Sequence, residues 1–232
     1  MCCRWLTGIV LLLFVSKFAV AQTAEPSATR PQAEGGKTPR AEGLLFNGKD
    51  LTGWETPRTG YFDRPGAVRV ENQAIVLEAG RPATGIVWRG DVFRNEYEIT
   101  LEAKRISGDD FFCGLTFPID KSYCTLILGG WGGGTTGLSN IGDDAAVENE
   151  SSGFVEFKND RWYRVRLRVA EKKIETWVDD EKIVDVATPD KRFSIWWEQE
   201  PMRPLGIATW NTKAAVRNIR IGRIEAPQRP SP

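Results

Sequence analysis

Carboxylates, amides and indoles gather around one glycine-rich stretch of this sequence, residues 129–134. Trp131 stands alone among its five glycines, and the polar and acidic residues 139–150 follow soon after. Indoles stack on apolar ring faces, and carboxylates and amides hydrogen-bond hydroxyl groups, a combination that suits a sugar. The side chains of this kind that we single out are Asp110, Trp131, Asp143, Asp144, Glu148, Asn149, Glu150, Trp196, Trp197, Glu198, Trp210 and Asn211.

Each of these groups also has a purely structural interpretation. The chain has nine tryptophans, and most of them are expected to pack in a core or on a sheet surface. Trp131 differs because a lone indole among glycines has little scaffold of its own to pack against. The acidic side chains of residues 139–150 either form a cluster that serves as a base or binds Ca²⁺, or they only make the loop soluble.

The sequence has no histidine, which excludes His-dependent triads, His metal clusters and imidazole bases. A general acid or base must then be Asp, Glu, Tyr, Lys or a water molecule. Lys and Arg total 31, as do Asp and Glu, and removal of Arg4 and Lys17 with a leader leaves 29 against 31, a formal charge of −2. This balance predicts no polyanionic partner and no nucleic-acid binding.

Both ends of the chain are predicted to lie outside the folded domain. Residues 1–21 have an apolar run and an Ala-Val-Ala end, which predicts a cleaved secretory signal, export to the periplasm or the exterior, and no membrane attachment afterwards. Residues 22–42 predict a disordered linker and residues 226–232 a disordered tail, because both lack large apolar side chains. One domain over residues 43–225 remains, and its oligomeric state stays open.

The glycine-rich stretch follows a predicted hairpin. Residues 109–117 and 122–128 read as strands joined by a four-residue turn, with Phe117 opposite Ser122. The period of two then predicts a core side with Phe111, Cys113, Leu115, Phe117, Cys124, Leu126 and Leu128. The other side, where a ligand is expected, carries Asp110, Phe112, Gly114, Thr116, Tyr123, Thr125 and Ile127. Cys113 and Cys124 are diagonal neighbours in this register, so a disulfide and two buried thiols both remain open.

Other segments alternate in the same way, and none shows a sustained helical period. Residues 95–105 and 161–169 place apolar residues on one face, and residues 174–178 pair back so that Arg168 faces Glu175 and Arg166 faces Trp177. The arginine row is either a groove for an anionic ligand or a solvated sheet face. The pattern predicts an all-β fold of two antiparallel sheets packed face to face.

With these strands placed, a family resemblance can be stated. Residues 45–54, LFNGKDLTGW, and residues 204–221, PLGIATWNTKAAVRNIRI, resemble the 3-keto-disaccharide hydrolase domain family, and the features FFCGLTFP and GGWGG are similar to a planctomycete-type subgroup. Residues 161–163 and 174–185 resemble concanavalin A-like and laminin G-like sandwiches. The resemblance implies a jelly-roll sandwich that takes sugars and cleaves glycosides oxidised to a ketone at carbon 3.

The chemistry that this resemblance implies is deprotonation at carbon 2, loss of the carbon-1 substituent and addition of water. Residues 112–118 and 123–129 lack the arginine and carboxylates of the family's better-known branch, so no catalytic residue is transferred by position. On chemical grounds we expect Glu150 or Asp110 as the base. The expected substrate-binding side chains are Trp131, Asn149, Glu198, Trp210 and Asn211.

Two further hypotheses remain beside a 3-keto-glycoside hydrolase or lyase. A non-catalytic sandwich of lectin type needs only stacking and hydrogen bonds to an oligosaccharide. A laminin G-like module would use the arginine row and the Trp-rich C-terminal part to bind a protein. Cofactors are not required by any of these hypotheses, although Ca²⁺ is compatible with the acidic segment.

Overall fold

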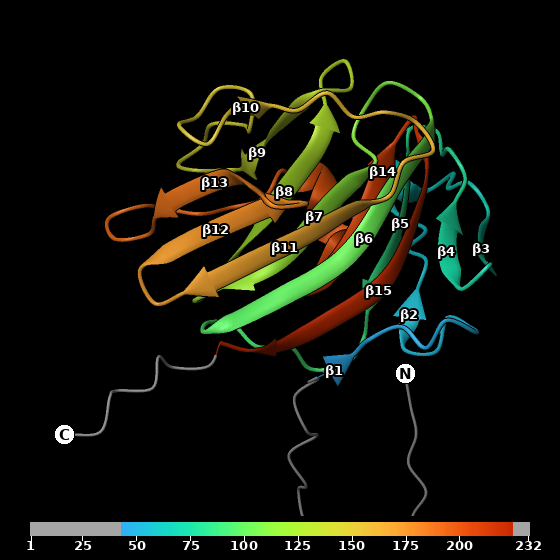
Figure 1. Ribbon diagram of the computed structural model, residues 1–232, viewed down its shortest axis with the longest axis horizontal. Helices are drawn as coiled ribbons and strands as arrows, with labels where there is room; N and C mark the ends of the chain where they lie inside the picture. The colour runs from blue at the N-terminus through green and yellow to red at the C-terminus, as the bar shows by residue number, and fades with distance from the viewer. Residues whose placement is uncertain (1–42, 225–232) are drawn as a thin grey trace, which may run out of the picture. The chain divides into compact units, whose positions relative to one another are not determined.

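The computed structural model describes residues 43–224, and these residues form two antiparallel sheets. The predicted leader, linker and tail lie outside the described residues. Figure 1 shows the eight-stranded sheet in front of the seven-stranded one. No helix in the described part of the chain is long and apolar enough to cross a membrane. The predicted all-β, two-sheet sandwich is therefore confirmed.

The eight-stranded sheet runs in the order β13, β12, β11, β6, β15, β4 and β3, with β1 paired to β15. Its strands are β1 (Gly43–Leu44), β3 (Val68–Glu71), β4 (Ala74–Leu77), β6 (Tyr97–Ser107), β11 (Tyr163–Ala170), β12 (Lys173–Val178), β13 (Glu181–Ala187) and β15 (Lys213–Arg223). The predicted alternation of β6 and β11 is confirmed, because every second residue is buried. Arg168 faces Glu175 and Arg166 faces Trp177, as expected.

The seven-stranded sheet runs in the order β10, β9, β8, β7, β14, β5 and β2. Its strands are β2 (Trp54–Glu55), β5 (Ala83–Trp88), β7 (Cys113–Ile119), β8 (Ser122–Gly130), β9 (Thr135–Ser139), β10 (Gly153–Phe154) and β14 (Leu205–Trp210). Two 3₁₀ turns, η1 (Gly60–Phe62) and η2 (Trp197–Met202), complete the described elements. The main core contains side chains of both sheets, among them Tyr97, Ile99, Leu115, Phe117, Leu126, Tyr163, Val165 and Leu167.

The central hairpin exists, but its predicted register was wrong. Phe117 faces Cys124, and Ile119 faces Ser122, so the turn is only Asp120 and Lys121. Ile119 belongs to the main core, and this burial keeps the strand going beyond the expected turn. Asp120 takes a left-handed φ of 45° that closes the short turn.

The two phenylalanines before β7 also exchange their predicted faces. Phe112 is in the main core, where its ring centroid lies 4.9 Å from that of Phe157. Phe111 packs in a second cluster with Ile127 and Ala208. The reason is that β7 begins only at Cys113, so the period of two does not extend back to these residues.

Cys113 and Cys124 are two buried free thiols. Cys113 faces Leu128, and Cys124 faces Phe117, four residues further along β7. Four residues of a strand span about 13 Å, roughly twice the Cα separation that a disulfide tolerates. Of the two open alternatives, the structure therefore shows the buried thiols.

Candidate functional site

The outward face of the seven-stranded sheet provides the floor of a cavity. Cys124, Leu126 and Leu128 of β8 point into the main core, so Thr125 and Ile127 point the opposite way. On the same face, Met202 from η2 and Phe62 from η1 cover Gly85 of β5. They pack so closely that a Cβ added to Gly85 would lie 2.7 Å from the Met202 sulfur and 3.0 Å from the Phe62 ring. The two 3₁₀ turns thus cover one part of the sheet and leave the part around β8 open.

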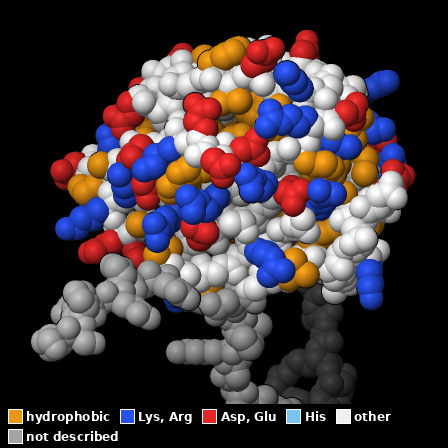
Figure 2. Space-filling model, in the orientation of Figure 1, with side chains coloured by type: hydrophobic (Ala, Val, Ile, Leu, Met, Phe, Trp, Pro, Cys, Tyr) orange, Lys and Arg blue, Asp and Glu red, His pale blue; other side chains and the backbone are white. Residues whose placement is uncertain are grey.

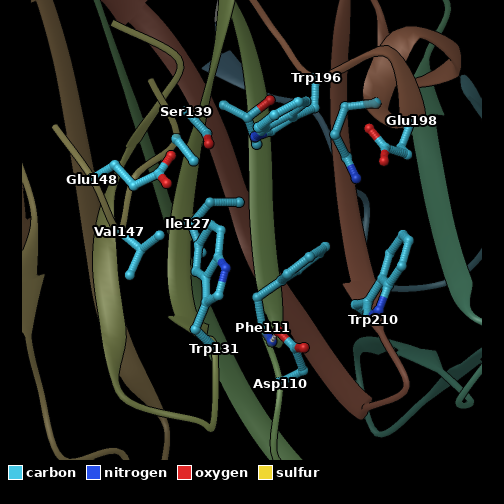
Figure 3. A pocket seen from close by; sticks show the side chains of 13 residues that line it. Asp110, Phe111, Ile127, Trp131, Ser139, Val147, Glu148, Trp196, Glu198 and Trp210 are labelled. Carbon is cyan, nitrogen blue, oxygen red and sulfur yellow. Dashed lines mark hydrogen bonds between the residues drawn. The ribbon is translucent and has the colours of Figure 1, made fainter. Parts of the chain in front are cut away.

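The open part holds a cavity of about 450 Å³, a volume that suits a small-molecule ligand. Its wall is predominantly apolar, and carboxylates reach it from three separate segments (Figure 3). The residues that line it are Asp110, Phe111, Thr125, Ile127, Trp131, Ser139, Ala145, Val147, Glu148, Trp196, Glu198, Gln199 and Trp210.

Asp110 lies at the entrance to β7 and is held by backbone groups. The N–H of Phe111 donates to its Oδ1 at 2.7 Å, and the Oγ1 of Thr212 bonds its backbone N and O at 3.2 and 3.1 Å. Burial raises the pKa of the Asp110 carboxyl, and the N–H groups of Phe111 and Trp131 limit that rise. A fixed carboxylate with a raised pKa is a suitable general base or acid.

Glu148 and Glu198 face the cavity from other elements. Glu148 comes from the turn after Ile141, in which its own N–H donates to the carbonyl of Ala145 at 2.9 Å. Glu198 belongs to η2, as does the buried Gln199. In Figure 3 Glu148, Glu198 and Asp110 approach from three sides. Within residues 43–224 none of these three side chains forms an ion pair, so no neighbouring Lys or Arg competes with a ligand for them.

Three indoles complete the wall. Trp131 and Trp196 are 47% and 39% exposed, unusual for so large an apolar side chain. Trp131 also has a left-handed φ of 45°, a conformation that costs free energy for a non-glycine residue. Trp210 is more buried, and its ring centroid lies 6.1 Å from that of Phe111. The exposed indoles offer flat apolar surfaces to a ligand.

Of the residues predicted from sequence, Asp110, Trp131, Glu198 and Trp210 meet at this cavity, and Trp196 and Glu148 from the wider candidate set join them. Asn149, Glu150 and Asn211 do not line it. Glu150 is paired with Lys191 at 2.6 Å. The amide of Asn149 donates to the carbonyls of Leu138 and Asp144. Asn211 is a turn residue with a φ of 46°.

The reason that Glu148, and not Glu150, reaches the cavity lies in the turn itself. Asn149 fixes this turn, because its Oδ1 also accepts from the hydroxyl of Ser151 at 2.5 Å. Within residues 43–224 no group of three or more Asp, Glu or Cys side chains is arranged to hold a metal ion. The acidic segment is thus spread along a turn, with Asp143 paired to Arg192 outside the cavity wall.

Five lining residues were not singled out from the sequence: Phe111, Ser139, Ala145, Val147 and Gln199. Phe111 was assigned to the core side because the start of β7 was placed too early. Ser139 accepts the N–H of Ala146 at 3.1 Å, a contact between segments that the sequence does not reveal. Gln199 carried no signal of its own, although it directly follows Glu198, which was a candidate.

The fold of this chain resembles that of several solved structures. A galectin-like protein of unknown function from Bacillus subtilis has a TM-score of 0.55 and 11% identity, and the match covers 79% of this chain and 97% of that one. Domain 4 of AbnA, a GH43 extracellular arabinanase from Geobacillus stearothermophilus solved with arabinotriose, has a TM-score of 0.52 and 15% identity, with 79% and 93% covered. A protein from Parabacteroides distasonis, provisionally assigned as a glycosyl hydrolase, has a TM-score of 0.50 and 15% identity, with 78% and 93% covered.

A search of curated proteins finds no match to this chain. At these low identities the solved structures show the fold alone. The sequence family is shown by a separate match, because a model of the 3-keto-alpha-glucoside-1,2-lyase-like domain covers residues 42–222. This chain therefore belongs to the 3-keto-alpha-glucoside-1,2-lyase-like domain family.

Proposed function

We propose that this protein is an exported enzyme that cleaves 3-keto-glycosides in the cavity over β8. The observation that carries the proposal is that three carboxylates without ion-pair partners and three indoles meet at one cavity of about 450 Å³ in a member of this family. The indoles supply stacking surfaces for a pyranose ring, and the carboxylates supply proton transfer and hydrogen bonds. The expected signal peptide remains the basis for export.

The ketone at carbon 3 makes the reaction accessible to a carboxylate. It acidifies the proton on carbon 2, so a base removes that proton and the electron pair passes to the carbonyl oxygen as an enolate. The enolate then expels the carbon-1 oxygen substituent, which takes up a proton, and a double bond forms between carbons 1 and 2. Addition of water across that double bond completes the hydrolysis. The sequence is redox-neutral and uses no oxidant.

Asp110 is the group that we assign as the base. Burial raises the pKa of its carboxyl, so the carboxylate is more basic than an ordinary aspartate, and the N–H groups of Phe111 and Trp131 hold it in place. Glu148, which approaches from the opposite wall in Figure 3, is the candidate proton donor to the leaving oxygen. Ser139 lines the same wall, and its hydroxyl is a candidate donor to the enolate oxygen.

A sugar-binding module without catalysis is the second candidate. The exposure of Trp131 and Trp196 favours it, because stacking surfaces alone are sufficient for recognition. In that case the carboxylates would hydrogen-bond ring hydroxyls, and no bond of the ligand would break.

The test is release of nitrophenol from a 4-nitrophenyl 3-keto-α-glucoside, beside its unoxidised parent. We expect release from the keto form only. Nitrophenolate leaves without a proton donor, so the strong loss of kcat in Glu148→Gln is expected with methyl 3-keto-α-glucoside, whose leaving oxygen must take up a proton. Glu150→Gln is the matched control, since it makes the same chemical change two residues away outside the cavity, and its kcat should equal that of the wild type. Binding of both sugars without release from either would establish the sugar-binding module instead.

A further inference from the structure

Exposed aromatic side chains continue beyond the cavity that we assign to the keto sugar. Trp197, directly after the lining residue Trp196, is 61% exposed and does not itself line the cavity. Its ring centroid lies 5.0 Å from that of Tyr61, on η1. An indole with this much exposure leaves a large apolar surface in water, which a folded protein normally buries.

This pair of rings is continuous with the cavity. The ring centroid of Tyr61 lies 5.5 Å from that of Trp210, and Trp210 lies 6.1 Å from Phe111. Both Trp210 and Phe111 line the cavity. Four rings therefore form one row that leads from the cavity floor, over the junction of η1 and η2, to the exposed indole of Trp197.

A second hollow lies further along the same face of the sheet. Thr125 lines the first cavity, and Tyr123, two residues earlier on the same side of β8, lines the second. Two residues of a strand span about 7 Å, so the hollows are close neighbours. The second hollow is rich in charged side chains, with Arg89 paired to Glu55 at 2.7 Å and Arg203 paired to Glu200. Such groups hydrogen-bond hydroxyls.

We propose that Trp197 and Tyr61 form a second sugar-binding subsite, which holds the unit attached to the keto sugar, so that oligosaccharides are preferred over simple alkyl glycosides. This inference rests on the proposed function of the neighbouring cavity. A row of separate rings beside a polar hollow matches a chain of pyranose units, each with an apolar face and a hydroxyl-bearing edge. A protein partner would instead favour one broad apolar patch.

The experiment compares two substrates that differ only in length. Methyl α-glucoside and maltotriose, each oxidised at carbon 3 of its non-reducing unit, are assayed with the wild type, Trp197→Ala, Trp197→Phe and Phe154→Ala. Phe154 is the matched control, because it is 78% exposed on the edge strand β10 and does not line the cavity.

We expect kcat/KM for the keto-trisaccharide to fall roughly tenfold in Trp197→Ala, the effect typical of a stacking side chain that is removed. Trp197→Phe should restore most of it, and the methyl glycoside should be unaffected by every variant. An equal loss on both substrates, or no loss on either, would overturn the inference, and the second result would also point to a protein as the occupant of this surface.

Failure of the proposed function is distinguishable from failure of this inference. If the wild type turns over neither substrate, calorimetric titration with unoxidised maltotriose and methyl α-glucoside replaces the rate assay. Tighter binding of maltotriose that is lost in Trp197→Ala would uphold the second subsite in a non-catalytic module. Equal binding of the two sugars, or no binding of either, would overturn it.

Discussion

The outward face of the eight-stranded sheet and the cavity over β8 use charge in opposite ways. On the eight-stranded sheet, charges satisfy one another across strands. Lys182 bonds Glu175 at 2.6 Å, and Arg217 bonds Glu102 at 2.7 Å. Figure 2 shows Lys and Arg interspersed with Asp and Glu over this face. On the seven-stranded sheet, Asp110, Glu148 and Glu198 surround a hollow without such partners.

The absence of ion-pair partners makes the cavity the better place for chemistry. Paired surface charges are screened, and each pair contributes little to stability. A carboxylate without a partner beside an apolar cavity acts on whatever enters it. The arginine row belongs to the first kind of face, since Arg164 is paired with Asp180 at 3.0 Å and Arg166 lies 3.8 Å from the ring centre of Trp177.

Replacing one carboxylate on each face should give the largest contrast. Asp110→Asn removes the proposed base, and we expect kcat for a 3-keto-glycoside to fall by roughly 10²- to 10⁴-fold. Glu102→Gln, on the other face, should leave kcat unchanged. Comparable losses in both variants would remove the distinction between the two faces.

The pH dependence of activity should also report the cavity carboxylate. Because burial raises the pKa of Asp110, the acid limb of kcat/KM should have an apparent pKa above the ordinary aspartate value of about 3.9. Below that limb the rate should fall about tenfold per pH unit, as the base becomes protonated. The same raised pKa also affects stability. Above the pKa of Asp110 in the folded protein, ionising this buried carboxyl lowers the free energy of unfolding, and below its pKa in the unfolded chain this cost is absent. A limb at or below the ordinary value would contradict the assignment of Asp110 as the base.

The seven-stranded sheet is covered by η2 at Gly206, whereas Gly222 of the eight-stranded sheet has no covering element within the described residues, and a glycine-to-alanine variant at each position tests this difference. A Cβ on Gly206 of β14 would lie 2.5 Å from the backbone carbonyl oxygen of Met202, so Gly206→Ala must displace η2. We expect a loss of about 1–3 kcal/mol in the free energy of unfolding, measured by denaturant titration. Gly222→Ala in β15 meets no atom within 4 Å and should change that free energy by less than about 0.5 kcal/mol. Similar losses in the two would show that η2 does not rest on Gly206.

The smallest expected effect concerns the ion pair of the eight-stranded sheet. Burial raises the pKa of Glu102, but hydrogen bonds from Arg217 and Asn218 outweigh it and lower the pKa overall. Glu102→Gln should therefore cost roughly 0.5–1 kcal/mol at neutral pH. Because the pKa of Glu102 is lowered by folding, the ion pair stabilises the protein above the pKa of the unfolded chain, about 4.3. This stabilisation is lost as the pH falls through the pKa of Glu102 in the folded protein. Unfolding free energies of both proteins should converge in acid, and a constant difference would argue against the pairing.

Much of the fold could be predicted because strand alternation and short turns are local. The pairing of Arg168 with Glu175 follows from one turn length, and the side of β8 that carries Thr125 and Ile127 follows from its period. The place where β7 begins is set by tertiary packing of Phe112 against Phe157, so Phe111 was placed on the wrong face.

The candidate site was only partly predictable, for the same reason. Which carboxylate of the acidic segment reaches the cavity depends on a turn that Asn149 fixes through contacts with Leu138 and Asp144. The recognisable motif at residues 45–54 is structural. Asn47 and Asp50 bond each other at 2.8 Å in a tight turn, and the indole N–H of Trp54 donates to the carbonyl of Leu45 at 2.9 Å. The motif that identifies the family thus gives no catalytic group.

The most direct test of the central claim is a kinetic isotope effect on a 3-keto-glycoside with hydrogen or deuterium at carbon 2. If a carboxylate in this cavity removes that proton, the deuterated substrate should react several-fold more slowly under kcat/KM conditions, and the unoxidised parent should not react at all. Cleavage of the unoxidised parent at the same rate, with no difference between hydrogen and deuterium, would show that the enzyme does not remove the proton on carbon 2.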